Sequence, residues 1–227
     1  MEPSAHFVDE DSPNRNSAWQ YFRIAILSVA VLFVLFLSGK IWWKHAYPYG
    51  TSHSCSAGLA ISLIGYAHEN GGWLPHGLQT PEASLSLLHT NDPMTATWFM
   101  RGKHLPQSVV DQALARDGCL SPDTCGWHYV EGLREGDALD IAVAWDKVEG
   151  LDHNGRRRSG LMHEVAFLDG SHTCITKDEW AEFVKKQKHL LAEVIAKRPL
   201  NSPPVRWSDE QTLGPNKFPP PAISKSK

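Results

Sequence analysis

The amino-acid sequence predicts an α+β protein, in which an N-terminal transmembrane helix precedes a domain with helices first and a small antiparallel sheet later. Three observations support this prediction. An apolar segment long enough for a lipid bilayer lies near the start of the 227-residue chain. Helical periodicity follows it as far as about residue 117. Short β-rich segments then cluster ahead of one long amphipathic helix.

Residues 1–21 are polar and acidic and contain two prolines, so we expect a disordered cytoplasmic tail. This tail contains four carboxylates and one arginine, which accounts for the net charge of −3. The rest of the chain is balanced between basic and acidic side chains. A balanced domain lacks the positive field that nucleic acids require, so no nucleic-acid partner is expected.

Residues 22–44 are predicted to form the transmembrane helix, because about 20 apolar residues at helical rise cross a bilayer core. No charge and no proline interrupts residues 24–37, and Trp42 and Trp43 stand where an interfacial aromatic belt is expected. A buried core helix would show a polar stripe, which this segment lacks. The long acidic tail argues against a cleaved signal peptide, so an uncleaved signal anchor is favoured and the lipid bilayer is an expected partner.

The orientation of the anchor does not follow from charge, because two basic residues flank each end of it. The cysteines are more informative, since all four follow the span and an even number fits an oxidising compartment. We therefore expect a single-pass protein of the cell inner membrane whose C-terminal domain is periplasmic, or extracytoplasmic.

Residues 45–198 are predicted to form this domain. Apolar spacing and breaker residues predict helices over residues 52–70, 80–89 and 105–117. Short β-rich segments predict strands over 127–130, 141–145, 165–168 and 172–175. Asp169-Gly170 is a hairpin signal, because both residues can adopt positive φ.

A capping box formed by Thr176 and Glu179 then opens a long amphipathic helix that ends before Pro199. The apolar face of this helix is expected to pack on the preceding hairpin. Residues 199–227 are rich in proline and are predicted to be a disordered tail.

The ordered set of motifs resembles type IV pilin-like and type II secretion pseudopilin-like proteins of the planctomycete type. It comprises a membrane helix, a Cys55-to-Pro75 helix-and-exit segment, Trp145-Asp146, His153-Asn154-Gly155 and a strand that ends in Asp169-Gly170. The resemblance covers about residues 54–180. It implies a pilin-like ectodomain, in which an N-terminal helix packs on a small antiparallel sheet.

The N-terminus departs from that family. No glycine precedes the span, and no acidic residue lies within it. The family's leader processing and filament contacts depend on such residues. The sequence therefore indicates a pilin-like ectodomain on an ordinary signal anchor.

The cysteines suggest two disulfides in this compartment. Cys119 and Cys125 bracket a turn-rich loop, which leaves Cys55 to pair with Cys174. Four cysteines allow three pairings, and unpaired buried thiols are the main alternative. A four-cysteine zinc site is disfavoured, because no two cysteines have the short spacing of zinc ligands.

Histidines and aspartates between Trp127 and His172 provide the alternative function, a metal-dependent enzyme or metal binder of the envelope. The candidates are His128, His153, His163, Asp137, Asp140, Asp146, Asp152 and Asp169. No motif of fixed spacing accompanies them, so Asp146 and His153-Asn154-Gly155 are interpreted as residues that organise loop backbone.

Arg156-Arg157-Arg158 is interpreted as a solvated loop. We expect no catalytic residue and no cofactor. The sequence thus favours a membrane-anchored, pilin- or pseudopilin-like structural or interaction protein of the cell envelope. Its candidate partners are other envelope or secretion-system proteins.

Overall fold

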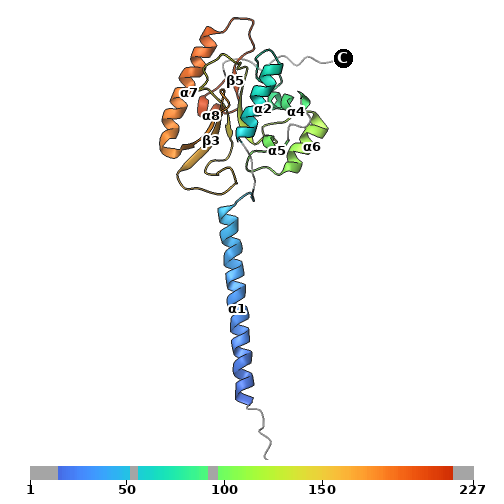
Figure 1. Ribbon diagram of the computed structural model, residues 1–227, viewed down its shortest axis with the longest axis vertical. Helices are drawn as coiled ribbons and strands as arrows, with labels where there is room; N and C mark the ends of the chain where they lie inside the picture. The colour runs from blue at the N-terminus through green and yellow to red at the C-terminus, as the bar shows by residue number, and fades with distance from the viewer. Residues whose placement is uncertain (1–14, 52–55, 92–96, 217–227) are drawn as a thin grey trace, which may run out of the picture. The chain divides into compact units, whose positions relative to one another are not determined.

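The computed structural model describes residues 15–51, 56–91 and 97–216, and its contacts divide the chain into two units, residues 1–45 and 46–227 (Figure 1). The first unit is dominated by helix α1, Arg15–Ala46. From Trp19 to Ala46 this helix is long and apolar enough to cross a membrane, and its side chains from Trp19 to His45 are exposed.

Helix α1 begins earlier than expected. Residues 15–21 were assigned to a disordered tail, but they are helical. No proline or glycine lies between Arg15 and Phe22 to end the helix, so it extends toward the N-terminus. Residues 1–14 of the predicted tail lie outside the described residues.

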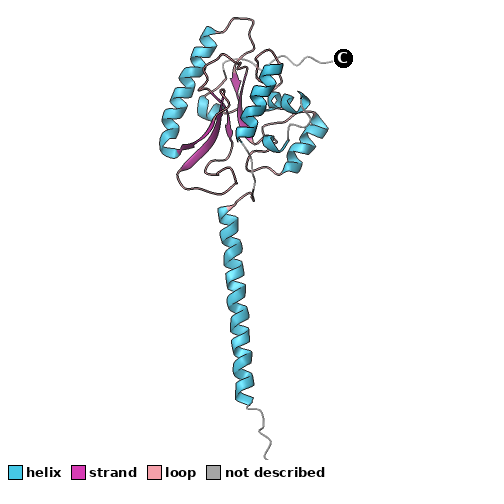
Figure 2. Cartoon of the chain, in the orientation of Figure 1, coloured by secondary structure: helices cyan, strands magenta, loops and turns pink. Residues whose placement is uncertain are grey.

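The second unit is α+β and contains a five-stranded antiparallel sheet (Figure 2). The strands are β1 Trp127–Glu131, β2 Ala142–Asp146, β3 Leu161–Phe167, β4 His172–Thr176 and β5 Arg206–Trp207. Their order in the sheet is β4-β3-β2-β1-β5, so the first four form a meander and β5 adds to the free edge of β1. The four predicted strands are confirmed, and β3 is longer than expected.

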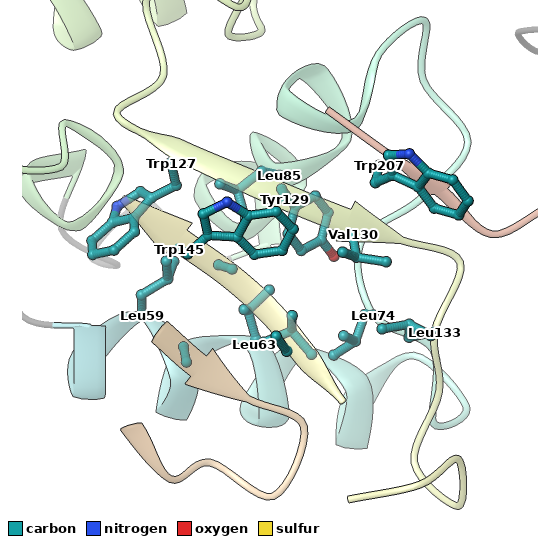
Figure 3. Close-up of a cluster of buried hydrophobic side chains, with 14 of the residues drawn as sticks. Leu59, Leu63, Leu74, Leu85, Trp127, Tyr129, Val130, Leu133, Trp145 and Trp207 are labelled. Carbon is teal, nitrogen blue, oxygen red and sulfur yellow. The ribbon is translucent and has the colours of Figure 1, made fainter. Parts of the chain in front are cut away.

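Helices cover one face of the sheet over the first half of the unit. They are α2 Ser56–Glu69, α3 Pro81–Leu85, α4 Leu87–Asn91, α5 Thr97–Met100 and α6 Gln107–Asp117. The side chains of Leu59 and Leu63 point from α2 toward the sheet and are fully buried there (Figure 3). The helices predicted over 52–70 and 105–117 are confirmed with shorter bounds, although residues 52–55 are outside the described part of the chain. The single helix predicted over 80–89 is instead divided into α3 and α4. Helix α5 was not predicted.

Helix α7, Lys177–Lys197, contacts β3 and β4 on the other side of the sheet (Figure 1). Its predicted capping box is present, because the Glu179 carboxylate accepts the backbone N–H of Thr176 at 3.0 Å. The ring of Trp180 packs at a tilt against His163 of β3, with ring centroids 4.5 Å apart. The predicted packing of this amphipathic helix on the hairpin is therefore confirmed.

The β3–β4 hairpin is present, but its turn differs from the expected one. Only Gly170 has a positive φ, 82°, and Asp169 does not. The N–H of Gly170 donates to the carbonyl of Phe167, and the N–H of Phe167 donates to the carbonyl of Ser171. We expected a two-residue loop in which both residues have a positive φ. The structure instead has a turn that ends in a single left-handed residue, Gly170.

The predicted disordered tail over residues 199–227 is wrong for residues 199–216. Strand β5 pairs with β1, and α8, Glu210–Leu213, follows it. Val205, Trp207 and Leu213 are buried in the core. The prolines did not prevent this, because they stand before the short strand, where no sheet hydrogen bond is needed. Residues 217–227 lie outside the described chain.

The predicted disulfides are not formed by the described cysteines. Cys119 and Cys125 are both free, although they bracket a tight loop, and Cys174 is a free thiol exposed on β4. Burial raises the pKa of the Cys125 thiol to about 12. The alternative of an unpaired buried thiol therefore describes Cys125. Cys55, the expected partner of Cys174, lies outside the described residues.

Candidate ligand-binding cleft

The histidines and aspartates proposed for a metal site are dispersed over the domain. Asp137 pairs with Arg198 at 2.5 Å, and Asp140 pairs with Lys186 at 2.6 Å. Asp169 accepts the N–H of Ser171 inside the hairpin. Within the described ranges, no group of three or more histidine, cysteine or carboxylate side chains could hold a metal ion. The candidate metal constellation is therefore not assembled.

Asp146 and His163 instead belong to a buried ionic cluster that the sequence did not predict. The ammonium nitrogen of Lys103 lies 2.5 Å from Asp146 and 2.8 Å from Glu164. It also donates to the carbonyl of Leu151 at 2.7 Å. Nδ1 of His163 lies 2.7 Å from the other oxygen of Asp146.

The buried ionic cluster keeps its lysine charged. Burial disfavours an ammonium ion, but the carboxylates of Asp146 and Glu164 more than offset this and raise the pKa of Lys103. The hydroxyl of Ser56 on α2 also donates to Glu164. The Lys103 side chain is inaccessible to solvent, so the cluster connects elements of the core and cannot contact a substrate.

No local signal could have identified Lys103. It follows α5 in a turn, and its partner Asp146 is 43 residues away in the sequence. A lone lysine between two helices normally indicates a solvent-exposed position. The cluster forms only when folding brings Asp146 of β2 and Glu164 of β3 next to Lys103.

A cleft of about 470 Å³ opens beside β5, where the start of α3 faces the segment that leads into α8. The cleft walls combine amide, hydroxyl, charged and aromatic side chains. They are formed by Gln79, Thr80, Pro81, Glu82, Pro122, His128, Arg206, Trp207, Ser208, Asp209, Glu210, Gln211 and Asn216. Half of this wall comes from the segment that was predicted to be disordered.

Local sequence explains how both walls are held. Thr80 caps α3, because its hydroxyl accepts the N–H of Ala83, and Pro81 occupies the first helical position. Asp209 caps α8 through the N–H of Thr212 at 3.0 Å. Its second oxygen accepts the indole N–H of Trp145 at 3.0 Å. Trp145, one of the residues on which the predicted resemblance depends, therefore fixes one wall of the cleft.

His128 lies on β1 at the base of the cleft, with Nε2 3.8 Å from Asp209. That separation is too long for a hydrogen bond. Burial lowers the pKa of His128 to about 4, although Asp209 acts in the opposite direction. The imidazole is therefore neutral at physiological pH. A general base works best with a pKa near the operating pH, so His128 is poorly suited to proton transfer.

Two charged side chains of the cleft, Glu82 and Arg206, are held in ion pairs. Lys147 donates to Glu82 at 2.9 Å and to the carbonyl of Pro122 at 2.6 Å. Arg206 pairs with Glu131 and donates to the carbonyl of Leu78 at 2.6 Å. These pairs stiffen the walls and leave polar edges for a ligand. The arrangement suits recognition better than covalent chemistry.

The His153-Asn154-Gly155 motif lies in the loop between β2 and β3. One oxygen of Asp152 accepts the backbone N–H groups of Asn154 and Arg156, each at 3.0 Å. The N–H of Gly155 donates to the carbonyl of Asp152 at 2.8 Å, and Gly155 has a φ of 77°. The prediction that His153-Asn154-Gly155 lies in a loop organised by local hydrogen bonds is confirmed. The prediction that Asp146 organises a loop was wrong, because Asp146 is buried at the end of β2.

Comparisons of the chain with models of protein families, with curated proteins and with solved structures found no match. The fold and the cleft geometry therefore form the basis for the functional proposal.

Proposed function

We propose that the protein is a membrane-anchored, pilin- or pseudopilin-like interaction protein of the cell envelope. Its anchor crosses the inner membrane once, and the domain from residue 46 onward lies on the extracytoplasmic side. The observation that carries the proposal is the exposed apolar stretch Trp19–Ala46 of α1. A soluble protein would not leave such a helix uncovered, because each apolar side chain loses transfer free energy in water.

The domain supports the pilin-like part of the proposal through one packing relationship. Helix α2 lies on an antiparallel sheet and contacts β2, β3 and β4, the arrangement that the family resemblance implies. The chain differs from filament-forming members, because α1 and α2 are separate elements and α1 contains no carboxylate between Trp19 and Ala46. A tethered interaction domain fits this combination better than a filament subunit.

An interaction role is favoured over catalysis by the chemistry of the cleft. Its imidazole is neutral and weakly basic, and Glu82 and Arg206 are held in ion pairs. The hydroxyl of Ser208 accepts the N–H of Tyr129 at 2.9 Å. Such a surface is suited to binding a polar group through hydrogen bonds.

Membrane anchoring is tested by extraction of the full-length protein from isolated membranes. We expect it to remain in the pellet after alkaline carbonate and to dissolve only in detergent. A variant that lacks residues 22–44 should move to the soluble fraction. Release of the full-length protein by carbonate would contradict the proposal.

Orientation is tested with Cys174, whose thiol is exposed on β4. A maleimide that cannot cross the inner membrane should label Cys174 in cells with a permeable outer layer. Cys174→Ser supplies the matched control for this position. Labelling that requires disruption of the inner membrane would place the domain in the cytoplasm.

The interaction role is tested with a photo-crosslinking residue at Gln211 in the cleft and, as control, at Lys185 on the exposed side of α7. We expect a discrete adduct in intact cells from the cleft position only. Equal yields from the two positions, or none from the cleft, would count against the cleft as the binding surface.

A further inference from the structure

The β2–β3 loop displays three consecutive arginines, Arg156, Arg157 and Arg158, and all three are exposed. We refer to residues 150–158 as the arginine loop. Its backbone is held by several hydrogen bonds. Asp152 exchanges backbone bonds with Arg156 and Gly155, and an isolated bridge joins Leu151 to Arg157. The basic side chains are therefore presented from a defined scaffold.

The charge on the arginine loop is only partly neutralised. Asp152 is nearly buried and accepts a hydrogen bond from Arg158 at 3.0 Å. Burial would favour its neutral form, but bonds from the Arg156 and Asn154 amides and from Arg158 lower the pKa of Asp152, so it stays ionised. Glu149, just outside the loop, lies 3.6 Å from Lys177. One carboxylate thus faces three arginines, and a net positive charge remains.

One hydrogen bond joins the arginine loop to Ala46. The N–H of Arg157 donates to the carbonyl of Ala46 at 2.7 Å. Ala46 is the last residue of α1, where a helical carbonyl has no partner within the helix. Both residues belong to the second unit of the chain.

Chain connectivity then limits the distance between the arginines and the bilayer. Trp43 marks the interfacial aromatic position of the anchor, and Ala46 follows it by three residues. At about 1.5 Å per residue, Ala46 lies roughly 5 Å beyond Trp43 along the helix. Electrostatic attraction to anionic lipids acts within a Debye length, about 8 Å at physiological salt.

We propose that the arginine loop binds the anionic headgroups of the membrane in which the protein's own anchor resides. This inference rests on the proposed membrane anchoring and adds a lipid class to it. Guanidinium groups bind phosphate oxygens in a bidentate manner, and within the described part of the chain no carboxylate side chain pairs with Arg156 or Arg157 of the loop. The three arginines are exposed, as predicted for a solvated loop, and the backbone contact with Ala46 is the observation that the sequence did not reveal.

A lipid ligand is favoured over an acidic protein segment by this proximity. The proposed anchor tethers the domain to the bilayer, so headgroups are present at high local concentration. A protein partner would have to compete with them. The basic side chains would thereby fix how the domain rests on the membrane.

The test uses the full-length protein in nanodiscs of pure phosphatidylcholine or with one third phosphatidylglycerol. Hydrogen exchange of the peptide that covers residues 147–160 is followed by mass spectrometry. We expect exchange to slow at least about fivefold in the anionic discs, since each basic residue near such a surface contributes about that factor in affinity. High salt should abolish the difference.

The double substitution Arg156→Gln/Arg157→Gln should remove the lipid dependence, while Lys185→Gln/Lys188→Gln on α7 should retain it. Both variants keep Arg158 and its bond to Asp152, and exchange in β1–β3 reports whether each is folded. If hydrogen exchange of the loop is equally fast in the two kinds of nanodisc, the lipid proposal is overturned while the proposed anchoring is unaffected. A full-length chain that stays soluble without lipid or detergent would overturn both.

Discussion

The ammonium nitrogen of Lys103 lies 2.5 Å from a carboxylate oxygen of Asp146, and both side chains are almost completely shielded from solvent. This pair joins the turn after α5 to the end of β2, and Glu164 extends it to β3. Removing two ions from water is costly, and the cost is offset only when each ion retains close partners. The cluster meets this condition, because Lys103 has two carboxylates and one carbonyl as partners.

Lys103→Met is therefore expected to lower the free energy of unfolding of the domain by about 3–5 kcal/mol, because two buried carboxylates lose their cation. The measurement is urea unfolding of the detergent-solubilised protein, followed by tryptophan fluorescence. Lys185→Met is the matched control, since its side chain is exposed and should change stability by less than about 0.5 kcal/mol. A loss below about 1 kcal/mol for Lys103→Met would show that the cluster contributes little.

Two truncations test how much residues 199–216, which contain β5 and α8, contribute to the stability of the domain. Removal of residues 199–227 deletes β5 and α8 with three buried apolar side chains, at about 1.5–3 kcal/mol each. The sum approaches the whole stability of a typical domain, so this variant should unfold or aggregate. Removal of residues 217–227 alone should leave the melting temperature within about 2 °C. Equal melting temperatures for the two truncations would contradict the role of β5.

His128 gives the domain a defined pH dependence. Its pKa is about 4 in the folded state against about 6.5 when unfolded, so the unfolded chain binds the extra proton between these values. Stability is therefore complete above about pH 6.5 and falls as the pH drops toward 4. Between pH 7 and pH 5 the loss should be about 2 kcal/mol.

His128→Gln should remove that loss, because glutamine does not titrate. Wild-type and variant are compared by urea unfolding at pH 7 and pH 5, above the range where aspartates titrate. His104 also has a pKa lowered mainly by burial and contributes in the same direction to both proteins, so the difference isolates His128. Identical pH dependence in the two proteins would refute the assignment.

The elements that the sequence predicts correctly are those with local signals. The capping box at Thr176 and Glu179 and the Asp169-Gly170 turn depend on residues within five positions of one another. Periodicity likewise places α2 and α7, since each buries one face. Strand β5 was missed because only two residues pair, and their partners Val130 and Glu131 are distant in the sequence.

The cleft was missed for the same physical reason. Its walls come from α3, β1 and the β5–α8 segment, and only folding brings Glu82, His128 and Asp209 near one another. The sequence suggested a metal site between Trp127 and His172, because several His and Asp residues are close to one another there. In the structure they serve different elements: His163 joins the buried ionic cluster, and Asp152 shapes the arginine loop.

Thiol reactivity distinguishes the structure from the two-disulfide prediction. Cys174 is exposed on the edge strand β4, so iodoacetamide should modify it in the folded protein, although partial burial and Glu164 raise the pKa of its thiol and slow the reaction. Cys125 is fully buried, and its pKa of about 12 keeps it protonated at pH 8. The thiolate is the nucleophile, so Cys125 should react only after unfolding.

The measurement is peptide mass spectrometry of protein alkylated without reductant, first folded and then in denaturant. We expect Cys174 to be modified in both samples and Cys119 and Cys125 to be fully modified in denaturant. Cys174→Ser should leave the modification of the other two unchanged. Recovery of a peptide that links Cys119 to Cys125 would restore the disulfide prediction, since the two thiols could then not be free in the native protein.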